Sequence, residues 1–227
     1  MASDNSGHRQ RLQQKCDDKG HDALTDKELF ELLLFSMLPR IDTKPIVRSC
    51  FVKFKNFSGI LKASDKQLLE ITGLGEVSVR HIKAIATLLD RISFERIEHQ
   101  SVLSNWQDLQ FFCIQKLSHY PIEAFLMILL DNQNRVIAVE ELGQGTVNQM
   151  TIYPREVLKL ALSFEAVGVI LVHNHPSQDT RASREDIHLT NKLQSTLRSA
   201  NISLHDHLIV AGGKCISLRN QGLFSPD

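Results

Sequence analysis

The sequence predicts an α+β protein, in which an all-helical N-terminal region, residues 1–100, precedes an α/β region, residues 101–227, with a mixed sheet flanked by helices. Two observations carry this prediction. Helix-start patterns and apolar residues at helical spacing fill the first hundred residues, where no strand-like run appears. After about residue 120, apolar runs of strand length alternate with amphipathic helical segments.

Helix starts and stops in the N-terminal region follow from capping residues and prolines. T-x-x-E at Thr25 and S-x-x-Q at Ser64 have the form of capping boxes, whose side chains satisfy free backbone N–H groups at a helix start. Pro39 ends the first of these helices, and Pro45 belongs in the first turn of the next. Residues 1–20 are polar, and we expect them to be frayed.

A tight turn, Gly73-Leu74-Gly75, precedes the last helix of this region. The residues predicted to form the buried stripe of that helix are Val77, Ile82, Ile85 and Leu89. The region is expected to end near residue 100.

Five strand-like runs and two helices predict the α/β region. The runs AFLMILLD and RVIAVEEL are joined by the turn-type cluster NQN, and HLIVA and KCISL by a two-glycine hairpin signal. Between these pairs, a helix begins at Pro154 and a continuous apolar strand runs from Val167 to His173. Ser183 can cap a second helix, so the order is β-β-α-β-α-β-β.

Composition excludes several classes of protein. Because 26 Lys and Arg balance 26 Asp and Glu, the chain as a whole is not an electrostatic nucleic-acid binder. The four cysteines are far apart and form no C-x-x-C pair, which argues against a disulfide framework and against a thiolate zinc site. No signal-peptide segment and no membrane-spanning apolar run is visible. We therefore expect a cytoplasmic protein with reduced thiols and no membrane partner.

The end of the apolar strand, VHNHPSQDTRASRED, carries the strongest chemical signal. His173 and His175, at i and i+2 of an extended chain, point to the same side, so both imidazoles can bind one metal ion. Pro176 turns the chain out of the sheet. If Ser183 caps the next helix, Asp186 lies in its first turn and can supply a third ligand. Two His and one Asp leave a fourth position for water, as in catalytic zinc sites.

Each part of this pattern also has a purely structural explanation. A histidine at a strand end is commonly a polar tip with satisfied hydrogen bonds. Ser183 with an acidic residue three positions later is an ordinary capping arrangement. The combination of the five fixed positions in H-x-H-P-x₆-S-x-x-D favours the metal site.

This pattern resembles the JAMM signature of MPN-type zinc hydrolases, and YPREVLKLAL, GVILVHNHPS, SREDIHLT and DHLIV resemble the RadC family. The resemblance covers most of the chain and implies an MPN (JAMM) fold for residues 101–227. It implies that His173, His175 and Asp186 bind Zn²⁺, that Ser183 hydrogen-bonds near the reacting carbonyl oxygen, and that a Glu from an earlier strand is the base. The implied activity is that of a metalloprotease or isopeptidase, on a protein or peptide that the sequence does not identify.

Three glutamates are candidates for the base. Glu123 stands just before the run AFLMILLD, where JAMM enzymes place this residue, and it is our prediction. The alternative for Glu123 is a solvated residue at a strand start. Glu140 and Glu141 end the next strand, and one of them must face each side of the sheet.

Two further features stay open. Many RadC sequences carry Gly and Pro after H-N-H-P-S, whereas this chain has QDTRA, which leaves the stiffness of the loop in question. Asp179 in this loop is a weaker candidate ligand than Asp186, because it lies in the turn. In a second H-x-H, His205-Asp206-His207, either Asp206 or His207 can orient a ligand; the alternative is an ordinary edge strand.

The stretch ITGLGEVSVRHIKAI resembles a helix-hairpin-helix element, which binds DNA by offering the backbone N–H groups of its G-x-G turn to a phosphate. Arg80 and Lys83 lie in the helix behind the turn. A turn between helices also needs glycine for steric reasons, and the near-zero charge argues against tight non-specific binding. DNA binding and a structural or partner-docking role therefore both stay open.

Three functions are compatible with these patterns. The first is a zinc-dependent hydrolase, which is our prediction because every motif position is present. The second is a DNA-binding accessory protein of recombination and repair without proteolytic activity, in line with the traditional label of the RadC family. The third is an MPN-like scaffold that has lost catalysis.

Overall fold

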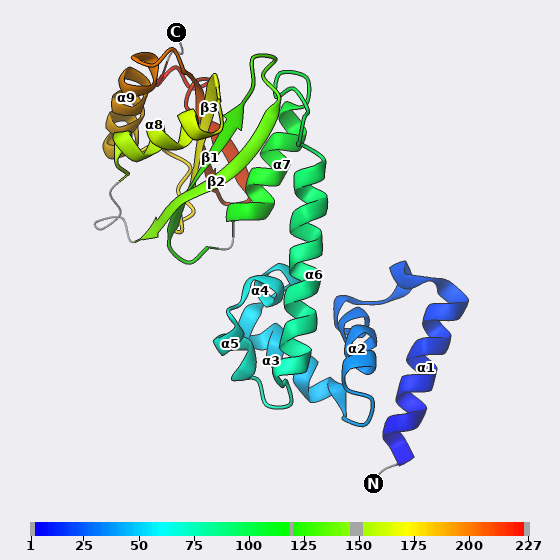
Figure 1. Ribbon diagram of the computed structural model, residues 1–227. Coiled ribbons are helices and arrows are strands. Elements are labelled where there is room, and N and C mark those ends of the chain that lie inside the picture. The colour runs from blue at the N-terminus through cyan, green and yellow to red at the C-terminus, as the bar shows by residue number, and fades with distance from the viewer. Residues whose placement is uncertain (1–2, 119, 146–151, 225–227) are drawn as a thin grey trace. The chain divides into compact units, whose positions relative to one another are not determined.

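The computed structural model describes residues 3–118, 120–145 and 152–224, and the chain divides into two compact units, residues 1–89 and 90–227 (Figure 1). Each unit is described by itself. Within the described residues, the first unit is helical and the second holds a mixed five-stranded sheet with helices packed on it. The predicted fold class is therefore confirmed.

Short helices that begin at capping residues build the first unit. They are α1 (Ser3–Lys19), a 3-10 turn (His21–Ala23), α2 (Asp26–Met37), α3 (Thr43–Phe54), α4 (Phe57–Lys62), α5 (Asp65–Leu69) and the first part of α6 (Glu76–Glu95). Both predicted capping boxes are present, at Thr25 and Ser64, and Pro45 lies in the first turn of α3. Apolar residues of α2 to α6, such as Leu34 and Ile60, form one core.

The N-terminal helix α1 shows that the prediction of a frayed segment at residues 1–20 is wrong for residues 3–19, whereas residues 1 and 2 lie outside the described residues. Leu12 and Cys16, one helical turn apart, are both buried. Arg9 donates a hydrogen bond to the carbonyl oxygen of Leu38 at the end of α2, at 2.5 Å. Two buried apolar residues and several polar contacts with α2 hold this helix in place, but two apolar residues are too few to stand out in a polar stretch.

The buried stripe of α6 differs from the predicted one. Ser78, Val79 and Ile82 are buried, whereas Val77 is 56% exposed and Leu89 is 48% exposed. Because each residue turns an α-helix by about 100°, a position next to the buried ones already lies on another face. Apolar residues occur on more than one face of α6, so their spacing alone did not identify the buried face.

The second unit is organised around a sheet with the strand order β2-β1-β3-β4-β5. Its elements are α7 (Trp106–Leu117), β1 (Glu123–Leu130), β2 (Val136–Gly145), α8 (Pro154–Ser163), β3 (Gly168–Asn174), α9 (Arg184–Arg198), β4 (Ser203–Ala211) and β5 (Lys214–Ser217). β3 and β4 are parallel and the other neighbouring strands are antiparallel, so the sheet is mixed. The succession from β1 to β5 is the predicted one, whereas α7 was not predicted.

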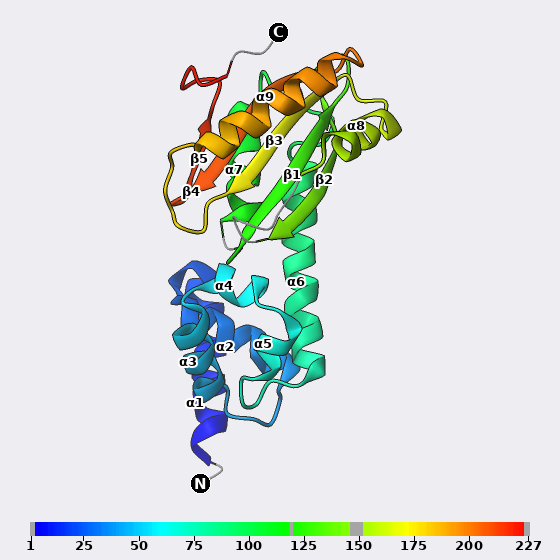
Figure 2. The ribbon, with the colours of Figure 1, turned by 90° about the vertical axis from the view of Figure 1, so that its left-hand side faces the viewer.

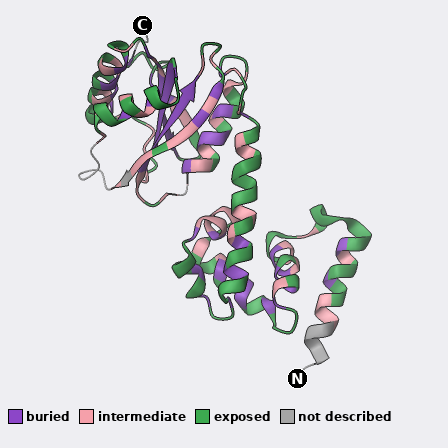
Figure 3. Ribbon diagram, in the orientation of Figure 1, coloured by how far each residue is buried: buried purple, intermediate pink, exposed green. Residues whose placement is uncertain are grey.

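Two apolar cores cover the two faces of this sheet. α8 and α9 pack on the face that carries Met127 and Leu129, and α7 packs on the face that carries Leu126 and Ile128 (Figure 2). β3 is buried along its whole length, as Figure 3 shows by colour. This burial explains the unbroken apolar run before His173.

Residues 90–102, which include the predicted boundary near residue 100, pack within the second unit. Ile97 and Val102 are buried in the core under α7, and Glu98 forms an isolated bridge with Val136 at the start of β2. The four cysteines of the chain are free. Among the described residues, no helix is both long enough and apolar enough to cross a membrane.

Candidate metal centre

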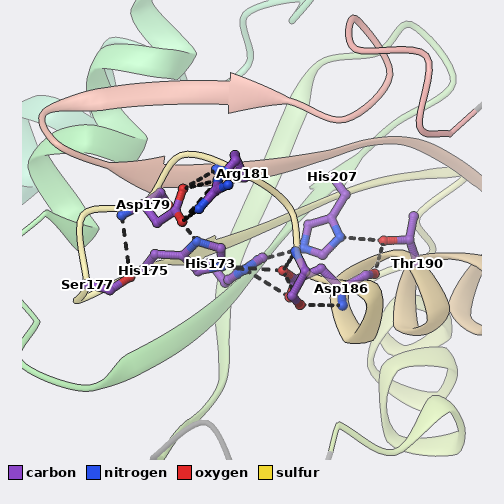
Figure 4. Close-up of polar contacts among 9 residues, drawn as sticks. His173, His175, Ser177, Asp179, Arg181, Asp186, Thr190 and His207 are labelled. Carbon is purple, nitrogen blue, oxygen red and sulfur yellow. Dashed lines mark hydrogen bonds and ion pairs between the residues drawn. The ribbon is translucent and has the colours of Figure 1, made fainter.

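Three side chains converge at the carboxyl end of β3 (Figure 4). The Nε2 atom of His173 lies 2.9 Å from Nε2 of His175 and 3.2 Å from Oδ1 of Asp186, and Nε2 of His175 lies 3.4 Å from Oδ2 of Asp186. One ligand atom from each residue lies within 4.8 Å of the other two. The structure therefore brings together the three residues that the sequence predicted as metal ligands.

Strand geometry explains why the two histidines meet, and it assigns a role to the residue between them. His173 and His175 point to one side of the chain, and Asn174 points to the other. The Asn174 side chain accepts one hydrogen bond from and donates two to backbone groups of residues 120–124, at 2.8 to 3.2 Å. Asn174 thus fixes the segment that leads into β1 and contains Glu123. Sequence reasoning missed it, although a polar residue in a buried strand was a usable signal.

The ring of His175 is oriented by the loop that follows it. Its Nδ1 lies 2.7 Å from the backbone oxygen of Asp179, which can only accept a hydrogen bond. Nδ1 therefore carries a hydrogen, and in the neutral ring Nε2 faces the cluster with a free electron pair. The hydrogen bond to Asp186 raises the pKa of His175, although burial opposes this.

The Asp179 carboxylate, the weaker candidate ligand, is held by another partner. Arg181 binds both of its oxygens, at 2.7 to 3.2 Å, and lowers the pKa of Asp179 to about 2. The backbone N–H of Gly212 donates to Oε1 of Gln178 at 2.7 Å. The loop without Gly and Pro is thus held by side-chain bonds, and the Asp179 carboxylate is not one of the clustered ligand groups.

Ser183 and Asp186 form the capping box at the start of α9. Oδ2 of Asp186 accepts hydrogen bonds from the backbone N–H and the hydroxyl of Ser183, both at 2.7 Å, and the Asp186 N–H donates to the Ser183 oxygen at 3.0 Å. Burial raises the pKa of Asp186, but hydrogen bonds with His173 and His175 outweigh it and keep the pKa well below its usual range. The capping explanation is therefore present in the structure, and it leaves a charged carboxylate with Oδ1 directed at His173.

A cavity of about 720 Å³ opens beside this cluster. Glu123 lines it together with His175, Ser183 and Asp186. The carboxylate of Glu123 is also close enough to contribute to the raised pKa of His175. The structure thus places Glu123 on the same cavity as His175 and Asp186, two of the three clustered residues.

The strand register places the other two glutamates elsewhere. Glu141 pairs with Leu126, whose side chain faces the core under α7. Glu140 pairs with Met127 and shares the face of the cluster, but it is not among the residues that line the cavity. Of the three candidates for a base, the geometry brings only Glu123 to the cavity wall.

The two candidate residues of the second H-x-H, His207 and Asp206, make contacts with different parts of the domain. The Nε2 atom of the fully buried His207 lies 2.8 Å from Nδ1 of His173. Burial, and then the neighbouring His173, lower the pKa of His207 well below its usual value. The Asp206 carboxylate instead binds the hydroxyl of Ser217 and the backbone N–H groups of His207 and Arg219, so it fixes the chain after β5.

The glycine turn before α6 has a packing explanation. Gly73 has a φ of +99°, and a Cβ at this position would lie 2.7 Å from the Ile46 side chain, so the turn requires glycine. The ammonium group of Lys83 donates to the carbonyl oxygens of Leu61 and Ala63, at the end of α4. The Lys83 side chain thus connects α6 to α4. DNA binding by the glycine turn stays a prediction.

The mixed sheet, its helices and the His-His-Asp cluster define a JAB/MPN-type domain. The family model of the RadC-like JAB domain matches residues 103–223. A UPF0758 protein from Rhodobacter capsulatus is 41% identical over 204 residues, which are 90% of this chain and 95% of that protein. A UPF0758 protein from Ruegeria pomeroyi is 38% identical over 215 residues, 95% of this chain and 96% of that protein. The chain belongs to the RadC family of JAB-domain proteins.

Proposed function

We propose that this protein is a zinc-dependent hydrolase that cleaves an amide or isopeptide-like bond in a protein or peptide. One observation carries the proposal. Two imidazole nitrogens and a charged carboxylate meet within 2.9 to 3.4 Å of one another at the wall of an open cavity. Membership in the JAB family supports it, because the ligand positions of the JAMM pattern are all present in this chain.

The chemistry of the three groups fits a zinc ion. In the neutral ring of His175, Nε2 carries no hydrogen, and it faces a second imidazole nitrogen and an anionic carboxylate. Such electron pairs repel one another unless a cation or a proton lies among them. Two imidazoles and one carboxylate, open to a cavity on the remaining side, are the groups that catalytic zinc sites use. Nε2 of His173, Nε2 of His175 and Oδ1 of Asp186 would hold the ion.

The remaining residues of the cavity supply the proton transfers. When bound, a zinc ion supplies Lewis acidity to water and to the substrate carbonyl group. The Glu123 carboxylate takes a proton from the attacking water and delivers it to the leaving nitrogen as the carbon–nitrogen bond breaks. The Ser183 hydroxyl, which donates to Asp186 in this structure, can turn toward the cavity and donate to the carbonyl oxygen as negative charge develops there.

Zinc uptake and peptide hydrolysis test this proposal in three proteins. Wild type and His188→Asn should each bind one zinc ion per chain, and wild type should cleave members of a library of quenched peptides and isopeptides. His173→Ala should do neither. His188 is the matched control, because it is exposed and lines the cavity but lies outside the cluster. A wild-type protein that binds no zinc at micromolar zinc concentrations contradicts the proposal. Zinc binding without hydrolysis favours an MPN-like scaffold that has lost catalysis.

A further inference from the structure

Two buried residues link the ligand candidates on their far side from the cavity. His207 on β4 and Thr190 on α9 both have no exposed surface. The distances along the chain of contacts are 2.8 Å from Nδ1 of His173 to Nε2 of His207, 2.6 Å from Nδ1 of His207 to the Thr190 hydroxyl, and 2.6 Å from that hydroxyl to the backbone oxygen of Asp186 (Figure 4). The chain of contacts therefore starts at one ligand candidate and ends at another.

The last group in this chain sets the direction of every hydrogen bond in it. A backbone carbonyl only accepts, so the Thr190 hydroxyl donates its single hydrogen to Asp186. The Thr190 oxygen then accepts from Nδ1 of His207. Burial favours the neutral ring of His207, whose Nε2 is in that case an acceptor. Nδ1 of His173 must then be the donor, so in the neutral ring Nε2 of His173 carries the free electron pair.

We propose that Thr190 and His207 are positioning residues that hold His173 in the tautomer with hydrogen on Nδ1, so that Nε2 can bind a metal ion. This inference rests on the zinc site of the proposed function. The backbone carbonyl of Asp179 fixes the same tautomer in His175, so a different hydrogen-bond acceptor orients each histidine. We call this series of hydrogen bonds, from His173 through His207 and Thr190 to Asp186, the relay. Because the relay ends on the backbone of Asp186, it also connects the first turn of α9 to the end of β3.

The chain offers a matched control for Thr190. Thr196, on the same helix, donates the same type of hydrogen bond to the carbonyl oxygen four residues earlier, at 2.9 Å. It is half-buried, its hydrogen bond is exposed, and it lies far along α9 from the cluster. A loss of helix stability alone should therefore appear in both Thr190→Val and Thr196→Val, whereas loss of the relay should appear only in Thr190→Val.

The experiment measures zinc affinity by competition with a chromogenic chelator, and the His173 tautomer in the metal-free full chain by long-range ¹H–¹⁵N NMR. In wild type, we expect hydrogen on Nδ1 of His173. In Thr190→Val, His207 loses its acceptor and can move its hydrogen to Nε2, so His173 should populate the other tautomer and zinc affinity should fall roughly 10- to 100-fold. Thr190→Ser keeps the hydroxyl and should restore both properties, and Thr196→Val should match wild type.

The relay is overturned if Thr190→Val keeps the wild-type tautomer of His173 and the wild-type zinc affinity. If Thr190→Val does not fold, His207→Gln and His207→Leu provide the same contrast. The glutamine carbonyl oxygen can accept from His173 and leucine cannot, so equal zinc affinities of these two variants overturn the proposal. A metal-free wild type with hydrogen on Nδ1 of His173 but without zinc affinity refutes the zinc function and leaves the relay standing.

Discussion

The ring of His173 lies flat against the ring of Phe125, with centroids 4.5 Å apart and an angle of 9° between the planes. The antiparallel register of β1 and β3 pairs these two residues, so the sheet itself produces the stack. Phe125 also lines the cavity beside the cluster. The stack fixes the plane of the imidazole, and the hydrogen bond from Nδ1 to His207 fixes its rotation within that plane.

Phe125→Leu should remove the stack while keeping an apolar side chain. We expect the free energy of unfolding to fall by about 1 to 2 kcal/mol, because an aromatic contact and some packing are lost. Zinc affinity should fall several-fold more than in Phe112→Leu, since Phe112 is buried in the core on the opposite face of the sheet. Denaturant unfolding and chelator competition measure the two quantities. Equal zinc affinities in the two variants would show that the stack contributes packing alone.

Glu123→Gln should separate metal binding from catalysis. The amide is close in shape to the carboxylate but cannot take a proton from water, so hydrolysis should fall by about 10²- to 10⁴-fold while zinc content stays at the wild-type value. Glu140→Gln is the control, because Glu140 lies on the same face of the sheet but does not line the cavity. If Glu140→Gln loses activity and Glu123→Gln keeps it, the base has been assigned to the wrong strand.

Asn174→Ala should weaken the segment that leads into β1. The substitution leaves the backbone N–H of Ala124 without its partner in a buried position, which costs about 1 to 3 kcal/mol of unfolding free energy. Hydrolytic activity should fall by more than the loss of folded protein explains, because the same segment carries Glu123. Zinc affinity should change little. Asn191→Ala, at an exposed position of α9, serves as the control. Unchanged activity in a destabilised Asn174→Ala would show that Glu123 is positioned without this side chain.

Local patterns predicted the parts of the fold that depend on neighbouring residues. The capping boxes at Thr25 and Ser64, the cap at Ser183 and the buried run before His173 all follow from residues within a few positions of each other. The geometry of H-x-H and of the first turn of the next helix was enough to predict that His173, His175 and Asp186 lie together.

The features that sequence reasoning missed depend on partners far away in the chain. α1 packs through Leu12 and Cys16, which only the folded unit shows to be buried. The role of Asn174 depends on backbone groups some fifty positions earlier. His207 was one of two predicted candidates for orienting a ligand, but its partner Thr190, which joins α9 to β4, was not predicted. Strand order and register decide such contacts, and both arise from the packing of the whole unit.

The contact between Lys15 on α1 and Glu28 on α2 predicts a pH dependence for the first unit. The hydrogen bond with Lys15, at 2.8 Å, and then that with the backbone of Thr25 lower the pKa of Glu28 from 4.5 to about 2. Because the pKa is lower in the folded chain, this contribution to stability is fully present above about pH 4.5 and is lost as the pH falls toward 2. Glu28→Gln keeps a capping side chain but removes the charge. Chemical denaturation followed by circular dichroism should therefore find this variant less stable than wild type at pH 6, with a difference that shrinks below pH 4.5. A difference that does not change with pH would mean that the charge of Glu28 contributes nothing and that only its shape matters.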